Sequence, residues 1–300
     1  MEPVYSLEKW CIITVNYNLA VDTIDCVRSL QAAGSSLEQI VVVDNASTDH
    51  SPEQLRAEFG TVLTIIESNS NQGYASGLNL GIEHALLNGF DWLLLMNNDT
   101  IVDPNFLAAL AQAADGNTET LFGPVIFFFD NPEIIWAMGD YRVQGTMFGY
   151  NRFLNHKLKP NLPDQLAVDF LNGCCMLVHR DIFERIGVWD TTYYMYGEEV
   201  DFCWRAQQAG FRMATVTKAH MLHKVSSSAK RIGSRALYLR VRNQNWFYRR
   251  YANPAQVILM ALFSFLRNMI YSIKRAWQGQ GREAFIPLLG WYDGWFRVKG

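Results

Sequence analysis

The chain has 300 residues, 49% of them hydrophobic and 18% charged, which suffices for one large domain or a domain plus an appendage. Its five cysteines show neither a CxxC pair nor a metal-type spacing, which argues against a disulfide framework and favours a reduced, cytoplasmic protein. The first ten residues, MEPVYSLEKW, contain no apolar run, so we expect no signal peptide.

The net charge of −3 conceals a strong asymmetry. Residues 1–217 contain 11 Lys+Arg against 27 Asp+Glu, whereas residues 218–300 contain 15 against 2. A basic tail suggests an anionic partner, such as a membrane surface, nucleic acid or phosphate. Because this tail is also rich in aromatic and aliphatic residues, we expect an anionic membrane surface and no nucleic acid.

The first hundred residues alternate between two kinds of segment. Residues 10–16, 39–44, 61–66 and 92–96 are short, continuously apolar runs, typical of strands buried on both faces of a parallel sheet. Residues 19–33, 51–59 and 74–89 have helical patterns. This alternation predicts a doubly wound α/β domain with a mostly parallel central sheet flanked by helices.

The rest of the chain is less regular. We expect edge strands and a long surface loop in residues 121–170, and helices at 181–187 and 198–209. From residue 235 the pattern is helical and basic, so we divide the chain into a domain at 1–234 and a helical, amphipathic extension at 235–300. Its most apolar stretch, residues 257–266, is about half of the roughly 20 residues that span a bilayer. That helix is expected to lie on a membrane or to pack on the body.

Polar residues end three of the predicted strands. Because ligands bind beyond the carboxyl ends of such strands, these residues predict a site. The stretch LLLMNNDT resembles a cation-binding pair of carboxylates in which one acid has become an amide, although alone it is also an acceptable turn. The residues are Asn16, Asp44, Asn45, Asn97, Asn98 and Asp99.

Three acids, Glu198, Glu199 and Asp201, lie at a predicted helix start. The helix dipole accounts for one or two acids there but less well for three. Crowded carboxylates raise one another's pKa, and a carboxylate tuned in this way can act as a general base.

A histidine and basic residues follow a late predicted strand. His223 is a candidate ligand near phosphate, with Lys224, Lys230 and Arg231 as counter-charges, and His220 is the competing candidate. The stretch NQGYASGLNLGI is not GxGxxG, which disfavours a hydride-transferring Rossmann enzyme, and its small residues suit close approach of a nucleotide or close helix packing.

Taken in order, these stretches resemble glycosyltransferase family 2, the GT-A-fold inverting sugar transferases, and within it the rhamnosyltransferase-like branch. The matching stretches are VNYN (15–18), VVVDNASTDHS (41–51), SNSNQGYASGLNLGI (68–82), LLLMNNDT (93–100), NGCCMLVHRDIFERIGVWD (172–190), MYGEEVDFCWRAQQAGFR (195–212) and HKVSSS (223–228). The order and spacing of the set make the resemblance specific over roughly residues 10–230.

The resemblance implies a role for each matching residue. Glu199 would be the catalytic base, although the family usually has Asp there, and Asp99 and His223 would bind Mg²⁺ or Mn²⁺ at the donor diphosphate. Asn172, Gly173, Glu198 and Asp201 would contact the donor sugar or the acceptor. The nucleotide would be held by Asn16, Asp44, Asn45, Asn71, Gly73, Asn97 and Asn98.

The implied function is transfer of a sugar, rhamnose from dTDP-rhamnose before UDP-hexoses or GDP-sugars, to a glycan or lipid-linked glycan in cell-surface polysaccharide synthesis. The protein would act in the cytoplasm at the inner face of the membrane, closing a loop at 223–235 over the donor. Two alternatives are a non-catalytic nucleotide-sugar-binding subunit and, less favoured, a nucleotidyltransferase, and a homo-oligomer is left open.

Overall fold

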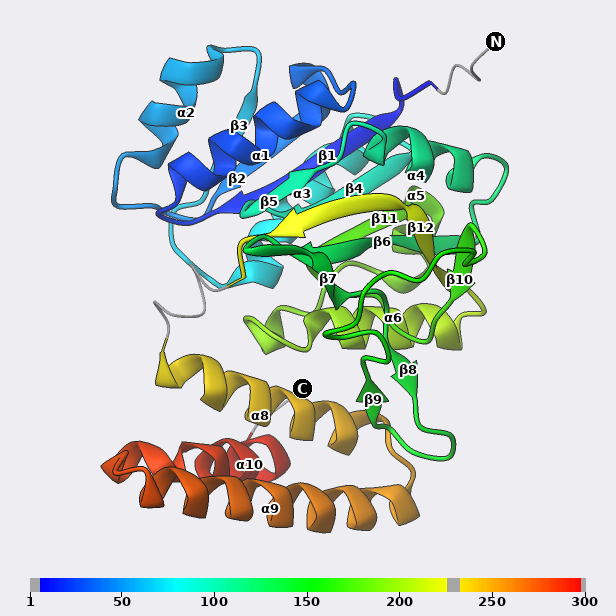
Figure 1. Cartoon of the computed structure of the whole chain (residues 1–300). Coiled ribbons are helices and arrows are strands. Elements are labelled where there is room, and N and C mark those ends of the chain that lie inside the picture. The colour runs from blue at the N-terminus through cyan, green and yellow to red at the C-terminus, as the bar shows by residue number, and fades with distance from the viewer. Residues whose placement is uncertain (1–5, 226–232, 298–300) are drawn as a thin grey trace.

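The computed structural model describes residues 6–225 and 233–297, and its centre is one mixed ten-stranded sheet (Figure 1). One half is parallel, in the order β4 (Trp92–Asn97), β1 (Trp10–Asn16), β2 (Ile40–Asp44) and β3 (Thr64–Glu67). These are the four apolar runs of the sequence, and β1 and β2 are buried along their whole length. Their parallel pairing was correctly predicted.

The other half of the sheet is mostly antiparallel. Here β11 (Cys175–His179) pairs antiparallel with β4 and with β6 (Thr120–Phe128), which is parallel to β12 (Arg212–His223). The short strands β5 (Thr100–Val102) and β10 (Gln165–Ala167) pair with β12, and β7 (Asn131–Ala137) pairs with β6. β6 was expected at an edge, but it lies inside the sheet because its apolar run is buried on both faces.

Helices cover both faces of the sheet and enclose two main cores. α1 (Ala20–Ala32), α2 (Ser51–Phe59) and α4 (Phe106–Ala114) pack on one face, and α3 (Tyr74–Leu87), α5 (Arg180–Ile186) and α6 (Glu198–Gln208) pack on the other. α4 was not predicted. A small hairpin, β8 (Tyr141–Arg142) with β9 (Gly149–Tyr150), stands apart from the sheet, and the 3-10 turns η1 (Leu37–Gln39) and η2 (Thr191–Tyr193) complete the body.

Three helices and one 3-10 turn form the C-terminal region: α8 (Ser234–Tyr251), α9 (Pro254–Trp277), η3 (Gly281–Phe285) and α10 (Ile286–Phe296). A capping box at Asn253 and the following proline start α9. α8 lies between the body and the outer pair α9 and α10 (Figure 1). Trp246 and Phe247 of α8 belong to the same core as α3 and α6. The division after residue 234 coincides with the start of α8, and as a domain boundary it stays a prediction.

α9 has an inverted amphipathic pattern. It buries Met260, Ser264, Asn268 and Ser272, one residue per turn, and exposes large apolar side chains on the opposite side. The exposed set is Ile258, Leu259, Leu262, Phe263, Phe265, Leu266, Ile270, Tyr271, Ile273 and Trp277. Within the described part of the chain, α9 is the one helix long and apolar enough to cross a membrane by length and composition. One stripe therefore packs on the protein, and the apolar stripe is left open.

Candidate functional site

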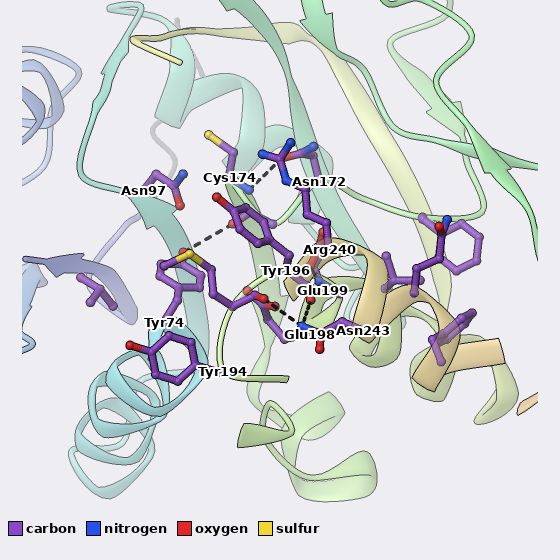
Figure 2. Close-up of a pocket in the computed structure, with 18 of the residues that line it drawn as sticks. Tyr74, Asn97, Asn172, Cys174, Tyr194, Tyr196, Glu198, Glu199, Arg240 and Asn243 are labelled. Atoms are coloured by element: carbon purple, nitrogen blue, oxygen red, sulfur yellow. Dashed lines mark hydrogen bonds between the residues drawn. The ribbon is translucent and has the colours of Figure 1, made fainter. Parts of the chain in front are cut away.

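A cavity of about 920 Å³ opens at the carboxyl ends of β1 and β4 and is closed on the far side by α8. Side chains from β4, α6 and α8 face one another across it (Figure 2). Ten of the residues predicted from the sequence line this cavity: Asn45, Asn71, Asn97, Asn98, Asp99, Asn172, Gly173, Glu198, Glu199 and His223. The polar residues after β2 and β4 therefore meet at one cavity, and their binding roles stay predictions.

Asn16 and Asp44 lie behind the cavity wall, not on it. They are register partners at the ends of β1 and β2, and the amide of Asn16 donates a 2.7 Å hydrogen bond to the Asp44 carboxylate. Ser47 donates to the same carboxylate through its backbone N–H, 2.8 Å away. Asn98 reaches this network through Thr23, whose hydroxyl oxygen accepts from the Asn98 amide at 2.8 Å. The network fixes the strand ends, and direct nucleotide contacts by Asn16 and Asp44 stay a prediction.

Gly73 supports the cavity wall from behind. The amide of Asn45 donates to the Asn71 side-chain oxygen at 3.2 Å and to the Gly73 carbonyl at 3.0 Å. Gly73 has φ +99°, and a Cβ there would lie 2.4 Å from the carbonyl oxygen of Tyr194. Only glycine meets both conditions, so this glycine keeps Asn45 and Asn71 at the cavity while staying off its surface.

Asp99 and His223 meet because β5, which begins directly after Asp99, pairs antiparallel with the last three residues of β12, ending at His223. His223 Nε2 lies 3.1 Å from Asp99 Oδ1, and both side chains are buried. Burial lowers the pKa of His223, but Cys174 and the Asp99 carboxylate outweigh it and raise that pKa to about 10. His223 Nδ1 is buried without a hydrogen-bond partner among the described residues.

These two residues fit a divalent cation that completes its coordination with diphosphate oxygens. One carboxylate and one imidazole are too few to hold such an ion alone, and the described residues contain no cluster of three His, Cys, Asp or Glu. The His223 imidazole would have to be neutral to bind either Mg²⁺ or Mn²⁺, so metal binding and protonation of His223 compete.

The other basic candidates have different surroundings. Lys224 is bound to α1 through Asp22 at 2.8 Å and Asp25 at 2.9 Å. His220 lies in a separate hollow, with Nε2 2.8 Å from the Thr217 carbonyl oxygen, so His223 is the histidine of the cavity. Lys230, Arg231 and most of the predicted closing loop at 223–235 lie outside the described residues.

The first turn of α6 brings two carboxylates to the cavity. Burial, and then the charge of Glu199, raises the pKa of Glu198 well above its ordinary value, and burial likewise raises the pKa of Glu199. Glu199 Oε2 accepts a 2.9 Å hydrogen bond from the Gly197 N–H. Glu198 Oε2 has no partner among the described residues. A carboxylate pair with raised pKa values can take up and release protons during a reaction.

Asp140 also lines the cavity, and the sequence analysis did not select it. Burial, and then the charge of Glu199, raises its pKa to about 6. No sequence motif surrounds Asp140. It comes close enough to feel the charge of Glu199 only because of how the segment after β7 folds.

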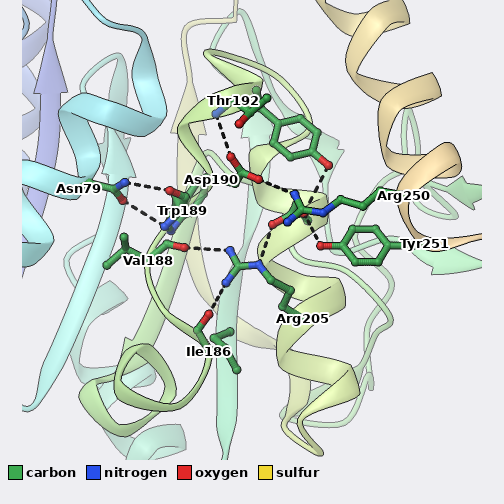
Figure 3. Close-up of polar contacts among 11 residues, drawn as sticks. Asn79, Ile186, Val188, Trp189, Asp190, Thr192, Arg205, Arg250 and Tyr251 are labelled. Atoms are coloured by element: carbon green, nitrogen blue, oxygen red, sulfur yellow. Dashed lines mark hydrogen bonds and ion pairs between the residues drawn. The ribbon is translucent and has the colours of Figure 1, made fainter. Parts of the chain in front are cut away.

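Asp201 does not belong to the site, contrary to our expectation of a donor-sugar or acceptor contact. It is fully buried and does not line the cavity, and Arg205 Nε and the Tyr251 hydroxyl each donate to its carboxylate at 2.7 Å. Figure 3 shows Arg205, Arg250 and Tyr251 gathered in this cluster. Arg250 lies 3.4 Å from the same carboxylate and also pairs with Asp190. The cluster ties α6 to α8. Asp201 is one helical position past the cavity-facing turn, which explains the error.

Asn243 of α8 braces the loop before α6, and sequence reasoning missed it. Its amide donates to the carbonyl oxygens of Tyr193, Met195 and Tyr196 at 2.8, 2.9 and 2.6 Å. Tyr194 and Tyr196 both have positive φ angles, which non-glycine residues rarely adopt without such support. The C-terminal region therefore sets the geometry of the loop at 193–197, which leads into Glu198 and Glu199 at the start of α6.

Gly173 packs directly on Glu199, which gives a first prediction. A Cβ at Gly173 would lie 3.0 Å from the Cβ of Glu199 and 3.3 Å from its Cγ, so Gly173→Ala must displace the Glu199 side chain. Because small misplacement of a reacting group is costly, we expect roughly a 10²-fold lower turnover with little change in nucleotide affinity. Steady-state kinetics and calorimetric titration check this, with the melting temperature of the variant as the control for folding. Normal turnover would show that Glu199 tolerates displacement.

Comparison with known proteins agrees with the fold and the cavity. The family profile for glycosyl transferase family 2 matches residues 11–187. The chain is 28% identical over 247 residues to the low-salt glycan biosynthesis hexosyltransferase Agl10 of Haloferax volcanii, covering 79% of this chain and 75% of that one. It is 28% identical over 239 residues to the N-acetylglucosaminyl-diphospho-decaprenol L-rhamnosyltransferase of Mycobacterium tuberculosis, covering 73% and 77%.

Solved structures show the same fold. The mannosyltransferase of Pyrobaculum calidifontis, in complex with GDP-Man and Mn²⁺, aligns with TM-score 0.56 and 16% identity over 97% of this chain and 88% of its own. GalNAc-T7 with UDP, GalNAc and Mn²⁺ aligns with TM-score 0.63 and 17% identity over 85% of this chain, which spans about half of that protein. The GT-A-like fold expected from the sequence is confirmed, and this chain belongs to glycosyl transferase family 2.

Proposed function

We propose that the protein is an inverting, metal-dependent sugar transferase that uses a nucleotide-sugar donor and a hydroxyl acceptor. The observation that carries the proposal is the single cavity that joins a buried carboxylate pair on α6 to the buried Asp99–His223 pair at the strand ends. The first supplies a base for the acceptor, and the second faces the charge of a leaving diphosphate. Family membership and the hexosyltransferase and rhamnosyltransferase activities for which these relatives are named support this assignment.

In the proposed reaction Glu199 removes the proton from the acceptor hydroxyl as that oxygen attacks the anomeric carbon of the donor sugar. The bond from that carbon to the diphosphate oxygen breaks, and the electron pair leaves with the nucleoside diphosphate. Asn45, Asn71, Asn97 and Asn98 offer amides to the nucleotide, and Asn172 and Gly173 border the sugar. A divalent cation held by Asp99 and His223 would neutralise charge on the departing diphosphate.

The donor is tested by thermal shift with a panel of nucleoside diphosphates, with and without Mn²⁺. A ligand that binds only the folded state at 100 times its Kd stabilises it by about 2.7 kcal/mol, enough for a shift of several degrees. We expect dTDP to give the largest Mn²⁺-dependent rise, because rhamnosyltransferases recur among the relatives, including a dTDP-rhamnosyl transferase. A larger shift with UDP or GDP reassigns the donor.

A membrane surface is the proposed location of the acceptor, with a glycan on a lipid carrier as the substrate class. The exposed stripe of α9 is the opposite of what a water-facing helix shows, since its polar residues are inside and its large apolar residues outside. Lys274 is exposed on the same helix and suits anionic headgroups, whereas Arg267 donates to Gln244 and Arg275 lies 4.0 Å from Glu283. Each fully inserted side chain contributes about 1.5 kcal/mol or more to the free energy of membrane binding. Several side chains of the stripe inserted together therefore favour binding. The protein would sit at the inner face of the membrane.

Substitution of the α9 stripe tests membrane binding in the full chain. We expect Ile258→Ser, Leu262→Ser and Leu266→Ser together to reduce flotation with anionic liposomes by roughly 10-fold or more. The substituted side chains are 65%, 59% and 51% exposed, so folding should be retained. A matched control is the triple variant Val21→Ser, Val62→Ser and Leu87→Ser, which removes exposed apolar side chains from the body. Equal flotation of both variants would contradict membrane binding by α9.

A further inference from the structure

Two arginines of α8 project into the catalytic cavity and have no role in the mechanism above. Arg235 lies in the first turn of α8 and Arg240 five residues later, and both line the cavity with the α6 carboxylates. Figure 2 shows Arg240 beside Glu199, and the charge of Arg240 lowers the pKa that burial raises in Glu199. A cationic wall thus adjoins the proposed catalytic base.

These arginines differ from the others on α8. Arg250 pairs with Asp190 and Asp201, and Arg242 donates to Asn243 and to backbone carbonyls. In contrast, Arg235 and Arg240 stack on Tyr194 and Tyr196, with guanidinium carbons 4.9 and 4.4 Å from the ring centroids. Within residues 6–225 and 233–297 neither has a carboxylate at ion-pair distance. Stacking on a ring leaves the in-plane N–H groups of a guanidinium available to an anion.

Helix stability does not explain Arg235. The first turn of α8 contains no acid, and a cation there opposes the helix dipole by about 0.3–1 kcal/mol. Glu198 of α6, buried in the same cavity, also has an oxygen without a hydrogen-bond partner among the described residues.

We propose that Arg235 and Arg240 bind the diphosphate of a lipid-diphosphate acceptor, an inference that rests on the proposed function. Planar guanidinium groups match phosphate oxygens with paired hydrogen bonds. The donor's diphosphate belongs at Asp99 and His223, at the strand ends, whereas α8 lies next to the base that receives the acceptor. α8 lies between the body and the pair α9 and α10 (Figure 1), and it contributes side chains to the cavity lining. A diphosphate between a sugar at Glu199 and a lipid at α9 must pass α8.

Farnesyl diphosphate is a suitable probe, titrated calorimetrically into the full chain preloaded with Mn²⁺ and a saturating nucleoside diphosphate. The preloading blocks the donor site, and farnesol reports binding of the lipid alone. We expect the double variant Arg235→Gln, Arg240→Gln to weaken farnesyl diphosphate roughly tenfold or more, while farnesol and the nucleotide bind as before. Arg212→Gln is the matched control, because Arg212 is an exposed arginine at the far end of β12. Arg235→Lys with Arg240→Lys should recover part of the affinity.

Several outcomes would overturn the inference. Wild-type protein that binds farnesyl diphosphate no better than farnesol has no diphosphate site beside the nucleotide. An equal loss of nucleotide affinity in the double variant would assign the arginines to the donor's diphosphate. Failure of the proposed function would show separately, as absence of any Mn²⁺-dependent nucleotide binding in the wild type, before farnesyl diphosphate is added.

Discussion

Glu199→Gln is expected to lower the turnover number by about 10²–10⁴ while nucleotide affinity stays within twofold to threefold. The glutamine keeps the size of the side chain and can still accept the Gly197 N–H, but it cannot take a proton. Steady-state transfer assays and calorimetric titration of the nucleoside diphosphate measure the two quantities. A variant that matches the wild type in turnover would show that Glu199 is not the base. The glutamate in place of the family's usual aspartate would then mark a position that has lost its catalytic role.

The pH profile gives this prediction a second readout. Burial raises the pKa of Glu199, so the carboxylate becomes protonated, and the base inactive, as the pH falls through that raised value. We expect the acidic limb of kcat/KM to lie above about pH 4.3, the ordinary pKa of a glutamate side chain. The charge of Glu199 raises the pKa of Glu198 further, so Glu198 takes up its proton first as the pH falls and is neutral where Glu199 titrates. Glu198→Gln should therefore leave the limb close to its wild-type position, and a large shift would show that Glu198 is still charged there.

Asp99→Ala is expected to abolish the Mn²⁺-dependent part of nucleotide binding, whereas Asn97→Ala should only weaken binding. Asp99 Oδ1 lies 3.1 Å from His223 Nε2. Among the strand-end residues that line the cavity, Asp99 is the one with a carboxylate. Asn97 also lines the cavity, but its neutral amide contributes at most hydrogen bonds, of about 0.5–1.5 kcal/mol net. Titration of the nucleoside diphosphate with Mn²⁺ and with EDTA separates the metal-dependent part.

The control for Asp99→Ala is its effect on folding. Removing the carboxylate leaves His223 buried opposite an uncharged group, so the melting temperature without ligand must be measured alongside. Asp99→Asn keeps the shape and should also lose metal dependence. Equal effects of the Asn97 and Asp99 substitutions would mean that the metal has been assigned to the wrong residue.

The sequence predicted the parallel half of the sheet and its site because both depend on local patterns. Continuous apolar runs marked β1, β2 and β4, and the polar residues after them had to meet at one edge. The acids of α6 were recognisable for the same reason, since three in four positions exceed what a helix start requires. Which acid faced the cavity was not recognisable, because Asp201 and Glu198 differ only in helical phase relative to α8.

The contributions of the C-terminal region could not be read from its sequence. Asn243 and Arg240 belong to a basic, apolar helix that gives no catalytic signal, and they reach the site only because α8 packs on the loop at 193–197. Long-range packing of this kind depends on tertiary contacts rather than on motifs. The inverted pattern of α9 was visible as an amphipathic helix, but the structure was needed to show that the apolar stripe is the exposed one.

Acceptor-dependent release of nucleoside diphosphate is the most direct test of the account. Purified full-length protein with Mn²⁺, a panel of sugar nucleotides and a lipid-diphosphate sugar acceptor should release nucleoside diphosphate and glycosylated acceptor in equal amounts, with the anomeric configuration inverted by NMR. Glu199→Gln should show binding without this release. No release from any donor, or equal release without an acceptor, would contradict sugar transfer, and the first of these results would favour a nucleotide-sugar-binding subunit.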